Sequence, residues 1–422
     1  MRSTMMRRFL ICLLTLLAPI SVNAAGYDTP MTHSAKYIGM GGTAIGYVND
    51  ASALYHNPAA LSKVSGFGLA VSVSPLFGQL QASPHPQATN IDSNPSFSPF
   101  FMAAASYQIS DLITVAAGFY PLGGGGGGYS YEYDSSSGAL RSVEDTTQLT
   151  FLEASVGVSV KLMKYLSLGL AWRGTLTTFK REVVNTEAGS SSAYIDMDMS
   201  GQNWAGFRAG LSFQMSDNWG IGLTYRHRVD TQVSADKATV TGIPAEDGTY
   251  DFTIPSKLGL GTFVNFDQWR LAMDIEYAFN SQNGVAEVKG TAFGTPVAVK
   301  NIANWSDSVT VRLGAAYKIT KMVEGRIGYA HDTQAAANEY PTAFGTPPGA
   351  TNVFTLGAGL QLTDTIQLSV ALAHRRGSGE TKADDIPKTA SGAPECAFCG
   401  HPGVYSLSMW GAYIDASFQF GG

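Results

Sequence analysis

The chain is short of charge and of long apolar runs, and each shortage excludes a class of protein. Only 14% of its 422 residues are charged, yet the mean hydropathy is close to zero, at +0.02. Beyond the N-terminus no apolar run reaches the roughly 18 residues that a membrane helix needs, so helical membrane spans are not expected. Strands with one face toward lipid and one toward a lumen would give this composition.

The first apolar stretch is predicted to be an export signal. Three arginines, at positions 2, 7 and 8, precede the apolar core Phe9 to Ala18, which is too short to span a membrane. Val22-Asn23-Ala24 has the form of a cleavage site. Residues 1–24 are therefore predicted to be a signal peptide.

The mature chain is short of positive charge. Removing three arginines from the 27 lysines and arginines leaves 24 against 33 aspartates and glutamates, a net charge of −9. Binding to nucleic acid depends on neutralising phosphates, so a nucleic-acid partner is not expected.

Cysteine is also scarce. After the signal only Cys396 and Cys399 remain, in the sequence Cys-Ala-Phe-Cys. In an exported protein this spacing favours a small disulfide loop. Reduced thiols, a redox pair and half of a zinc site with His401 are the alternatives, but the redox motif lacks its βαβ context and the zinc site lacks a second ligand pair. The sequence thus predicts a disulfide and no metal site.

Alternating apolar and polar residues dominate the rest of the chain. They predict fourteen strands, most of them long enough for the roughly 9–11 residues that a tilted membrane strand needs. The predicted ranges are 67–77, 98–109, 112–121, 148–161, 165–180, 202–215, 219–229, 252–265, 268–280, 305–319, 322–333, 351–362, 365–376 and 404–420.

Charge is sorted by face within these strands. In 165–180 the leucines and Trp172 share one face and Arg173 lies on the other, and in 268–280 Asp274 and Glu276 oppose an apolar face. A basic residue on a lipid face costs about 2–4 kcal/mol at mid-membrane. Tryptophans and tyrosines near strand ends fit an interfacial girdle. The sequence therefore predicts an antiparallel, up-and-down membrane β-barrel with a polar lumen, rather than a soluble sandwich.

Short turns alternate with long polar loops, the pattern of bacterial outer-membrane barrels. The predicted long loops are 122–147, 181–201, 230–251, 281–304, 334–350 and 377–403. Both termini then lie on the short-turn side, the periplasm. The run Gly123 to Gly128 is predicted to be a mobile loop, because glycine-rich runs are flexible.

Residues 25–66 do not alternate and are predicted to form a small, partly helical plug packed against the barrel 67–422. Asp50 suits the N-cap of a helix over 51–56, which Asn57-Pro58 would end. Gly39 to Ala44 formally matches the dinucleotide pattern G-x-G-x-x-A, but no βαβ unit surrounds it. No cofactor is therefore expected.

This segment carries a resemblance to a known family. Ser34-Ala35, the glycine cluster Gly39 to Ala44 and the stretch Asn49 to Ala59, which ends in Asn-Pro-Ala, are similar to the N-terminal hatch of the FadL-type long-chain fatty acid transporters. That family also includes importers of toluene-like aromatic hydrocarbons. The resemblance implies a fourteen-stranded barrel with a hatch in its lumen.

The resemblance also implies a function. It implies passive uptake of hydrophobic molecules, most often long-chain fatty acids, through a monomeric barrel among outer-membrane lipids and lipopolysaccharide, with sideways exit through the barrel wall. Small aromatic hydrocarbons are the alternative substrates, and a non-specific porin or structural barrel is the alternative function. The residues that match the hatch motif are Asn57, Pro58, Ala59, Gly41 and Gly42.

Lumen bases are candidates for contact with a fatty carboxylate. They are Arg173, Arg208, Arg226, Arg312 and Lys318. The alternative is pairing with lumen acids, because buried charges are usually paired. Loop aromatics, Phe97, Phe100, Phe293, Phe344 and Phe398, are candidates for an apolar landing surface. No histidine is spaced as a nucleophile's partner and no G-x-S-x-G motif occurs, so no enzyme activity is expected.

Overall fold

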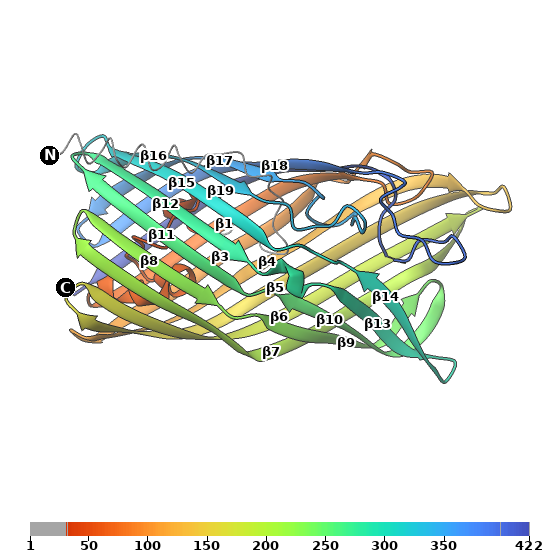
Figure 1. The fold of residues 1–422 in the computed structure, drawn as a ribbon, viewed down its shortest axis with the longest axis horizontal. Coiled ribbons are helices and arrows are strands. Elements are labelled where there is room, and N and C mark those ends of the chain that lie inside the picture. The colour runs from red at the N-terminus through yellow and green to blue at the C-terminus, as the bar shows by residue number, and fades with distance from the viewer. Residues whose placement is uncertain (1–30, 32, 397, 422) are drawn as a thin grey trace.

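A computed structural model describes residues 31, 33–396 and 398–421, and the predicted signal peptide lies outside them. These residues form a closed, antiparallel barrel of fourteen strands (Figure 1). The ring runs β1-β3-β4-β5-β6-β7-β8-β11-β12-β15-β16-β17-β18-β19, and β19 pairs with β1 from Phe67–Phe420 to Gln81–Ser406. No helix of the described residues is long and apolar enough to cross a membrane.

The barrel strands have the following bounds: β1 Phe67–Ala82, β3 Ser96–Ser110, β4 Ile113–Asp134, β5 Leu140–Met163, β6 Leu166–Glu187, β7 Ser190–Ser216, β8 Trp219–Arg226, β11 Lys257–Phe266, β12 Trp269–Ala278, β15 Ser308–Lys318, β16 Val323–Asp332, β17 Thr351–Thr363, β18 Ile366–Thr381 and β19 Gly403–Phe420. Five further strands of the described residues lie outside the ring: β2 Ile91–Asp92, β9 Val229–Val240, β10 Ile243–Ile254, β13 Val285–Ala292 and β14 Thr295–Ile302.

The predicted sorting of faces is confirmed. Leu168, Leu170 and Trp172 are exposed on the outside of β6, whereas Arg173 is fully buried inside. Asp274 of β12 is likewise buried. The apolar outer surface is therefore the face that meets lipid, and the charges lie in the lumen.

Several predicted long loops are wrong, because they are continuations of strands. β4 and β5 pair as far as Asp134–Leu140, and β6 and β7 as far as Glu187–Ser190. Ala188 and Gly189 both have positive φ, at 51° and 80°, as a tight two-residue hairpin requires. Predicted loops 230–251 and 281–304 contain the hairpins β9–β10 and β13–β14, which project from one side of the barrel (Figure 1).

The predicted mobile glycine loop is also wrong. Gly123 to Gly128 lie within β4, where they pair with residues of β5 from Phe151 to Thr146. The continuous backbone ladder to β5 overrides the low strand propensity of glycine, which is only a weak, context-dependent preference.

The described N-terminal residues before β1 lie inside the barrel and are called the plug segment here. It contains three short helices: α2 Ala35–Ile38, α3 Ala53–His56 and the 3₁₀ helix η1 Pro58–Lys63. α2 packs against β17, β18 and β19, and η1 against β5, β6 and β7. The predicted helix 51–56 is shorter than expected: its N-cap is Ser52, and Asp50 instead accepts a hydrogen bond from the backbone N–H of Ser52 at 3.0 Å.

Candidate functional site

Asn57 joins the plug segment to the barrel wall. Its backbone is extended (φ −158°), so it ends α3 and begins η1, where its side-chain oxygen accepts from the N–H of Ala59 at 3.2 Å. Its Nδ2 donates to the carbonyl oxygens of Ile45 at 3.0 Å and of Leu211 in β7 at 3.1 Å. Asn57 and Ala59 are fully buried, and Pro58 is buried as the first residue of η1. The Asn-Pro-Ala motif is thus an anchor point of the plug segment.

Glycines permit close approach between the plug segment and the barrel wall. Gly41 and Gly42 have φ of 72° and 80°, which favours glycine. A Cβ at Gly41 would lie 2.7 Å from the carbonyl oxygen of Leu313 in β15. On the wall, a Cβ at Gly210 would lie 2.2 Å from the side-chain oxygen of Asn57. Gly41 of the predicted motif and Gly210 of the wall therefore let the plug backbone lie directly on the wall.

An internal ion pair holds the middle of the plug segment together. Lys36 Nζ lies 3.0 Å from Asp50 Oδ2, which also accepts from the hydroxyl of Tyr37 at 2.8 Å. Burial alone would raise the pKa of Asp50, but the charge of Lys36 and the hydrogen bonds from Ser52, Lys36 and Tyr37 outweigh it and lower that pKa to about 2. Asp50 is therefore ionised at any physiological pH.

Lumen charges connect the plug segment to the wall. The fully buried carboxylate of Glu153 in β5 pairs with Arg173 Nε at 2.5 Å and with Arg208 Nη1 at 3.4 Å. Arg208 also donates to the carbonyl of Leu54 in α3 at 3.0 Å, and its guanidinium lies 5.2 Å from the ring centroid of Tyr55. Both arginines thus pair with a buried acid, and Arg208 also contacts the plug segment.

The other predicted lumen bases are placed differently. Arg312 in β15 pairs with Glu276, and Arg226 donates to the carbonyl of Pro255 at 3.0 Å. Lys318 is exposed at the end of β15, beside the turn to β16, so the structure does not bring it together with the buried arginines.

Replacing Glu153 with glutamine is expected to destabilise the barrel strongly, by about 3–5 kcal/mol, because two buried guanidinium groups lose their counter-charge. The matched control is Asp198→Asn, which breaks the exposed Lys180–Asp198 pair (3.4 Å) and should cost about 1 kcal/mol or less. Urea unfolding in detergent micelles measures both. Equal unfolding free energies for the two variants would contradict this role of Glu153.

β4 bends into the lumen beyond Phe119. β4 pairs with β5 along its whole length, with an extra residue, Leu122, between Pro121 and Gly123. Its pairing with β3 runs only from Ser110–Ile113 to Ala103–Phe119. Tyr120, Pro121 and Leu122 are all buried instead of alternating, and the hydroxyl of Tyr120 donates to Glu153 at 2.7 Å. The charge network therefore holds the bent strand inward.

The bend leaves an interruption in the barrel wall, called here the β3–β4 gap. Residues 96–102 of β3 continue to pair with β1 but pair with no residue of β4. The gap ends where the N–H of Asn94 donates to the carbonyl of Gly128 at 2.7 Å. Phe97 and Phe119, 59% and 39% exposed, flank it on the outer surface. The gap thus lies beside apolar side chains of the outer surface.

His33 of the plug segment also contacts this bend. Its Nε2 lies 2.6 Å from the carbonyl oxygen of Pro121. Burial lowers the pKa of His33 to about 3, more than the Pro121 hydrogen bond and the charge of Glu153 raise it. The ring is therefore neutral near pH 7 and donates to Pro121.

Acidification is expected to destabilise the folded protein through His33. Below the ordinary histidine pKa of 6.5 an exposed ring gains a proton and the buried ring does not, so stability falls as the pH drops from about 6.5 toward 3. When the pH is lowered from 7 to 5, the free energy of unfolding of the wild type should fall by about 2 kcal/mol more than that of His33→Gln. Glutamine keeps a hydrogen-bond donor but does not titrate. Unfolding at both pH values measures this, and equal losses would contradict it.

A cavity of about 180 Å³ lies between the β3–β4 gap and the loops. Ser96, Ser98 and Phe100 of β3 and Gly124 to Gly126 of β4 line it, so both edges of the gap belong to its wall. Its other apolar lining residues include Leu76, Leu80, Leu149, Phe179, Phe252, Phe344, Phe398 and Leu407. The cavity therefore reaches the gap from inside the barrel.

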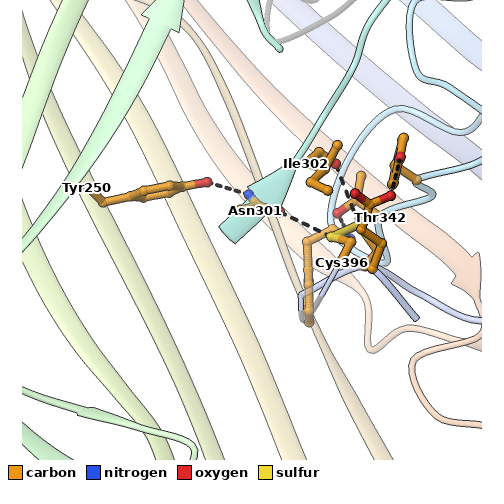
Figure 2. Close-up of a disulfide and its surroundings, with 9 residues drawn as sticks. Tyr250, Asn301, Ile302, Thr342 and Cys396 are labelled. Atoms are coloured by element: carbon orange, nitrogen blue, oxygen red, sulfur yellow. Dashed lines mark hydrogen bonds between the residues drawn. A yellow bond between two sulfur atoms is a disulfide. The ribbon is translucent and has the colours of Figure 1, made fainter. Parts of the chain in front are cut away.

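Cys396 and Cys399, which are joined by a disulfide, lie at the loop end of this cavity (Figure 2). Cys399 and Phe398 are among its lining residues. Among the described residues, no group of three or more His, Cys, Asp or Glu side chains is arranged to hold a metal ion.

Residues 16–395 match the model of a family described as outer membrane protein transport protein (OMPP1/FadL/TodX). The chain belongs to this family. It is an outer membrane protein, and relatives carry that name. Outer membrane protein P1 of Haemophilus influenzae is 26% identical over 216 residues, which cover 48% of this chain and 46% of P1. The match to the 47 kDa outer membrane protein of Pasteurella multocida (23% identical) likewise spans about half of that protein, 48%.

Solved structures share the fold of this family member. A Pseudomonas aeruginosa FadL homologue superimposes with a TM-score of 0.72 at 15% identity, covering 94% of this chain and all (100%) of that one. The Pseudomonas putida toluene transporter TodX superimposes with a TM-score of 0.66 at 18% identity, covering 93% of this chain and 100% of that one. Family members are transport channels.

The bend and the cavity are not among the predictions from sequence. The predicted strand 112–121 ends at Pro121, and the glycines after it fall in the predicted loop 122–147. A proline within a strand that continues beyond it is a signal for a bulge or an unpaired edge, and that signal was present at Pro121.

Proposed function

We propose that this protein takes up hydrophobic molecules, long-chain fatty acids first among them, across the outer membrane by passive diffusion. Substrate enters from the loop side, occupies the cavity, and leaves sideways through the β3–β4 gap into the membrane. The observation that carries the proposal is that both edges of this gap line the cavity. The protein acts as a monomer surrounded by outer-membrane lipid and lipopolysaccharide.

In this proposal the plug segment is a hatch that blocks the straight path to the periplasm. Asn57, Pro58 and Ala59 anchor it, and Gly41 and Gly42 let it lie against the wall. This is supported by the buried contacts of Asn57 with β7. His33 and Arg208 link the hatch to the bent part of β4, so movement of the hatch changes the gap. A carboxylate contact at the lumen arginines stays a prediction.

Small aromatic hydrocarbons are the second candidate substrates. The cavity favours them through its aromatic lining, which includes Phe179, Phe252 and Phe344. The names of solved relatives such as the toluene transporters TbuX and TodX support this candidate, although the likeness to them is one of fold.

The test is uptake of labelled oleate and toluene by an outer-membrane-transporter-deleted host with and without this protein. We expect faster uptake of one or both when the protein is present, with no gain in sugar permeability. Sugar leakage without hydrophobic uptake would replace the proposal with a non-specific porin.

A further inference from the structure

Three side chains from separate parts of the chain meet at the loop end of the cavity. They are Arg181 of β6, Phe344 between β16 and β17, and Phe398 beside the disulfide, and all three line the cavity. The guanidinium carbon of Arg181 lies 5.3 Å from the ring centroid of Phe344 and 5.9 Å from that of Phe398. One cation is therefore in contact range of two aromatic rings. We call this group the Phe–Arg–Phe clasp.

The cation of the clasp is fixed from the barrel side. Arg181 Nη2 pairs with Asp145 Oδ2 of β5 at 3.2 Å, and β5 and β6 are paired in this region. Asp145 thus compensates the charge of Arg181, and the flat faces of the guanidinium group remain accessible to the two rings.

The rings of the clasp are carried by segments outside the strands. The ring of Phe344 meets Tyr129 edge-on at 5.3 Å, and the hydroxyl of Tyr129 donates to the carbonyl of Ala343 at 2.8 Å. Phe398 lies between the disulfide-bonded Cys396 and Cys399. Separating the rings therefore breaks no strand pairing.

The disulfide fastens Phe398 to its neighbours. Cys399 Sγ lies 3.5 Å from the carbonyl oxygen of Ile302 at the end of β14, and Cys396 Sγ 3.9 Å from the side-chain oxygen of Asn301. Asn301 in turn donates to the hydroxyl of Tyr250 in β10 (Figure 2). The N–H of Gly400 donates to the carbonyl of Pro341 at 2.7 Å, which joins this region to the segment that carries Phe344.

We propose that the Phe–Arg–Phe clasp is the entrance gate of the cavity. Phe398, held by the disulfide, sets both the rate at which substrate enters and the size of substrate that can enter. The inference rests on the proposed uptake through this cavity. A hydrophobic substrate enters by displacing a ring from Arg181, and an apolar or aromatic group takes the place of that ring.

The clasp differs from an exposed landing surface. Phe344 and Phe398 are half-buried and face the cavity, whereas Phe293, at the tip of the β13–β14 hairpin, is 88% exposed and outside the cavity lining. Phe293 therefore provides a matched control: the same residue type, in a polar loop region, without the clasp contacts.

The test compares initial uptake rates of oleate and toluene in the transporter-deleted host for wild type, Phe398→Ala, Phe398→Trp and Phe293→Ala. Loss of one ordinary cation–π contact corresponds to a rate increase of about two- to fivefold. We expect this increase in Phe398→Ala, larger for oleate than for toluene, a decrease in Phe398→Trp, and no increase in Phe293→Ala. The heat-modifiable mobility of the folded barrel on gels normalises each rate to folded protein.

A second measurement leaves the ring in place. The double variant Cys396→Ser/Cys399→Ser, and reduction of the wild type with a phosphine, should each raise oleate uptake in the same direction as Phe398→Ala. One outcome refutes the gate alone: the wild type takes up the probes, but the uptake rates of Phe398→Ala and of the double variant equal those of the wild type or fall below them. The uptake proposal then stands. If the wild type transports neither probe, both are refuted.

Discussion

Replacing Gly125 with phenylalanine is expected to lower the uptake of oleate and toluene at least about fivefold, since a steric obstacle of about 1–3 kcal/mol corresponds to a roughly five- to 150-fold change. Gly125 lies on the β4 edge of the β3–β4 gap and lines the cavity. A Cβ at this position meets nothing within 4 Å, and its φ is not in the left-handed region. The phenyl ring would therefore fit the strand and fill the route.

The control for this variant is Gly284→Phe. A Cβ at Gly284 also meets nothing within 4 Å, and Gly284 lies just before β13, outside the cavity lining. Both variants should assemble as folded barrels, and only Gly125→Phe should lose uptake. Wild-type rates in a folded Gly125→Phe barrel would show that substrate does not pass this part of β4.

Replacing Asn57 with alanine is expected to release the hatch. The carbonyls of Ile45 and Leu211 and the N–H of Ala59 lose a buried partner, at a cost of about 1–3 kcal/mol for each unsatisfied group. Hydrogen exchange of the segment before β1 should become faster than in the wild type. Oleate uptake should change severalfold, and sensitivity to a bulky hydrophilic antibiotic should rise.

Ser62→Ala is the matched control, because Ser62 lies in the same η1 helix and donates to the carbonyl of Ala59 at 2.9 Å while only half-buried. Its effects should be much smaller. If Asn57→Ala speeds exchange but leaves uptake unchanged, the Asn-Pro-Ala motif serves packing alone.

The membrane strands could be predicted because lipid imposes a rule on each residue. On β6 every second side chain from Leu168 to Trp172 must be apolar, whereas Arg173 can be charged only inside. Beyond the membrane only the inward face of the strands follows such a rule, because Val143 and Met197 are buried there while the outward face meets water and can be polar. The turns inside the predicted loops still left a signal: Ala188-Gly189, Thr241-Gly242 and Phe293-Gly294 all have two positive φ angles, a hairpin geometry that glycine favours.

The site could be predicted only in part. Asn57 and the glycines before it form a local motif, and a motif can be found in one sequence. The partners of Glu153 could not be found this way, because Arg173 and Arg208 meet it only through the register of β5, β6 and β7. The bend at Pro121 likewise depends on contacts with His33 and Glu153 that are distant in the chain.

Passage of substrate through the β3–β4 gap can be measured directly by photolabelling. A fatty acid with a diazirine on its chain would be added to outer membranes containing this protein, irradiated, and its adducts located by mass spectrometry. We predict adducts in the cavity and on both edges of the gap, at residues 96–102 and 120–126. Adducts on the periplasmic side of the hatch, with none on the gap edges, would contradict sideways exit.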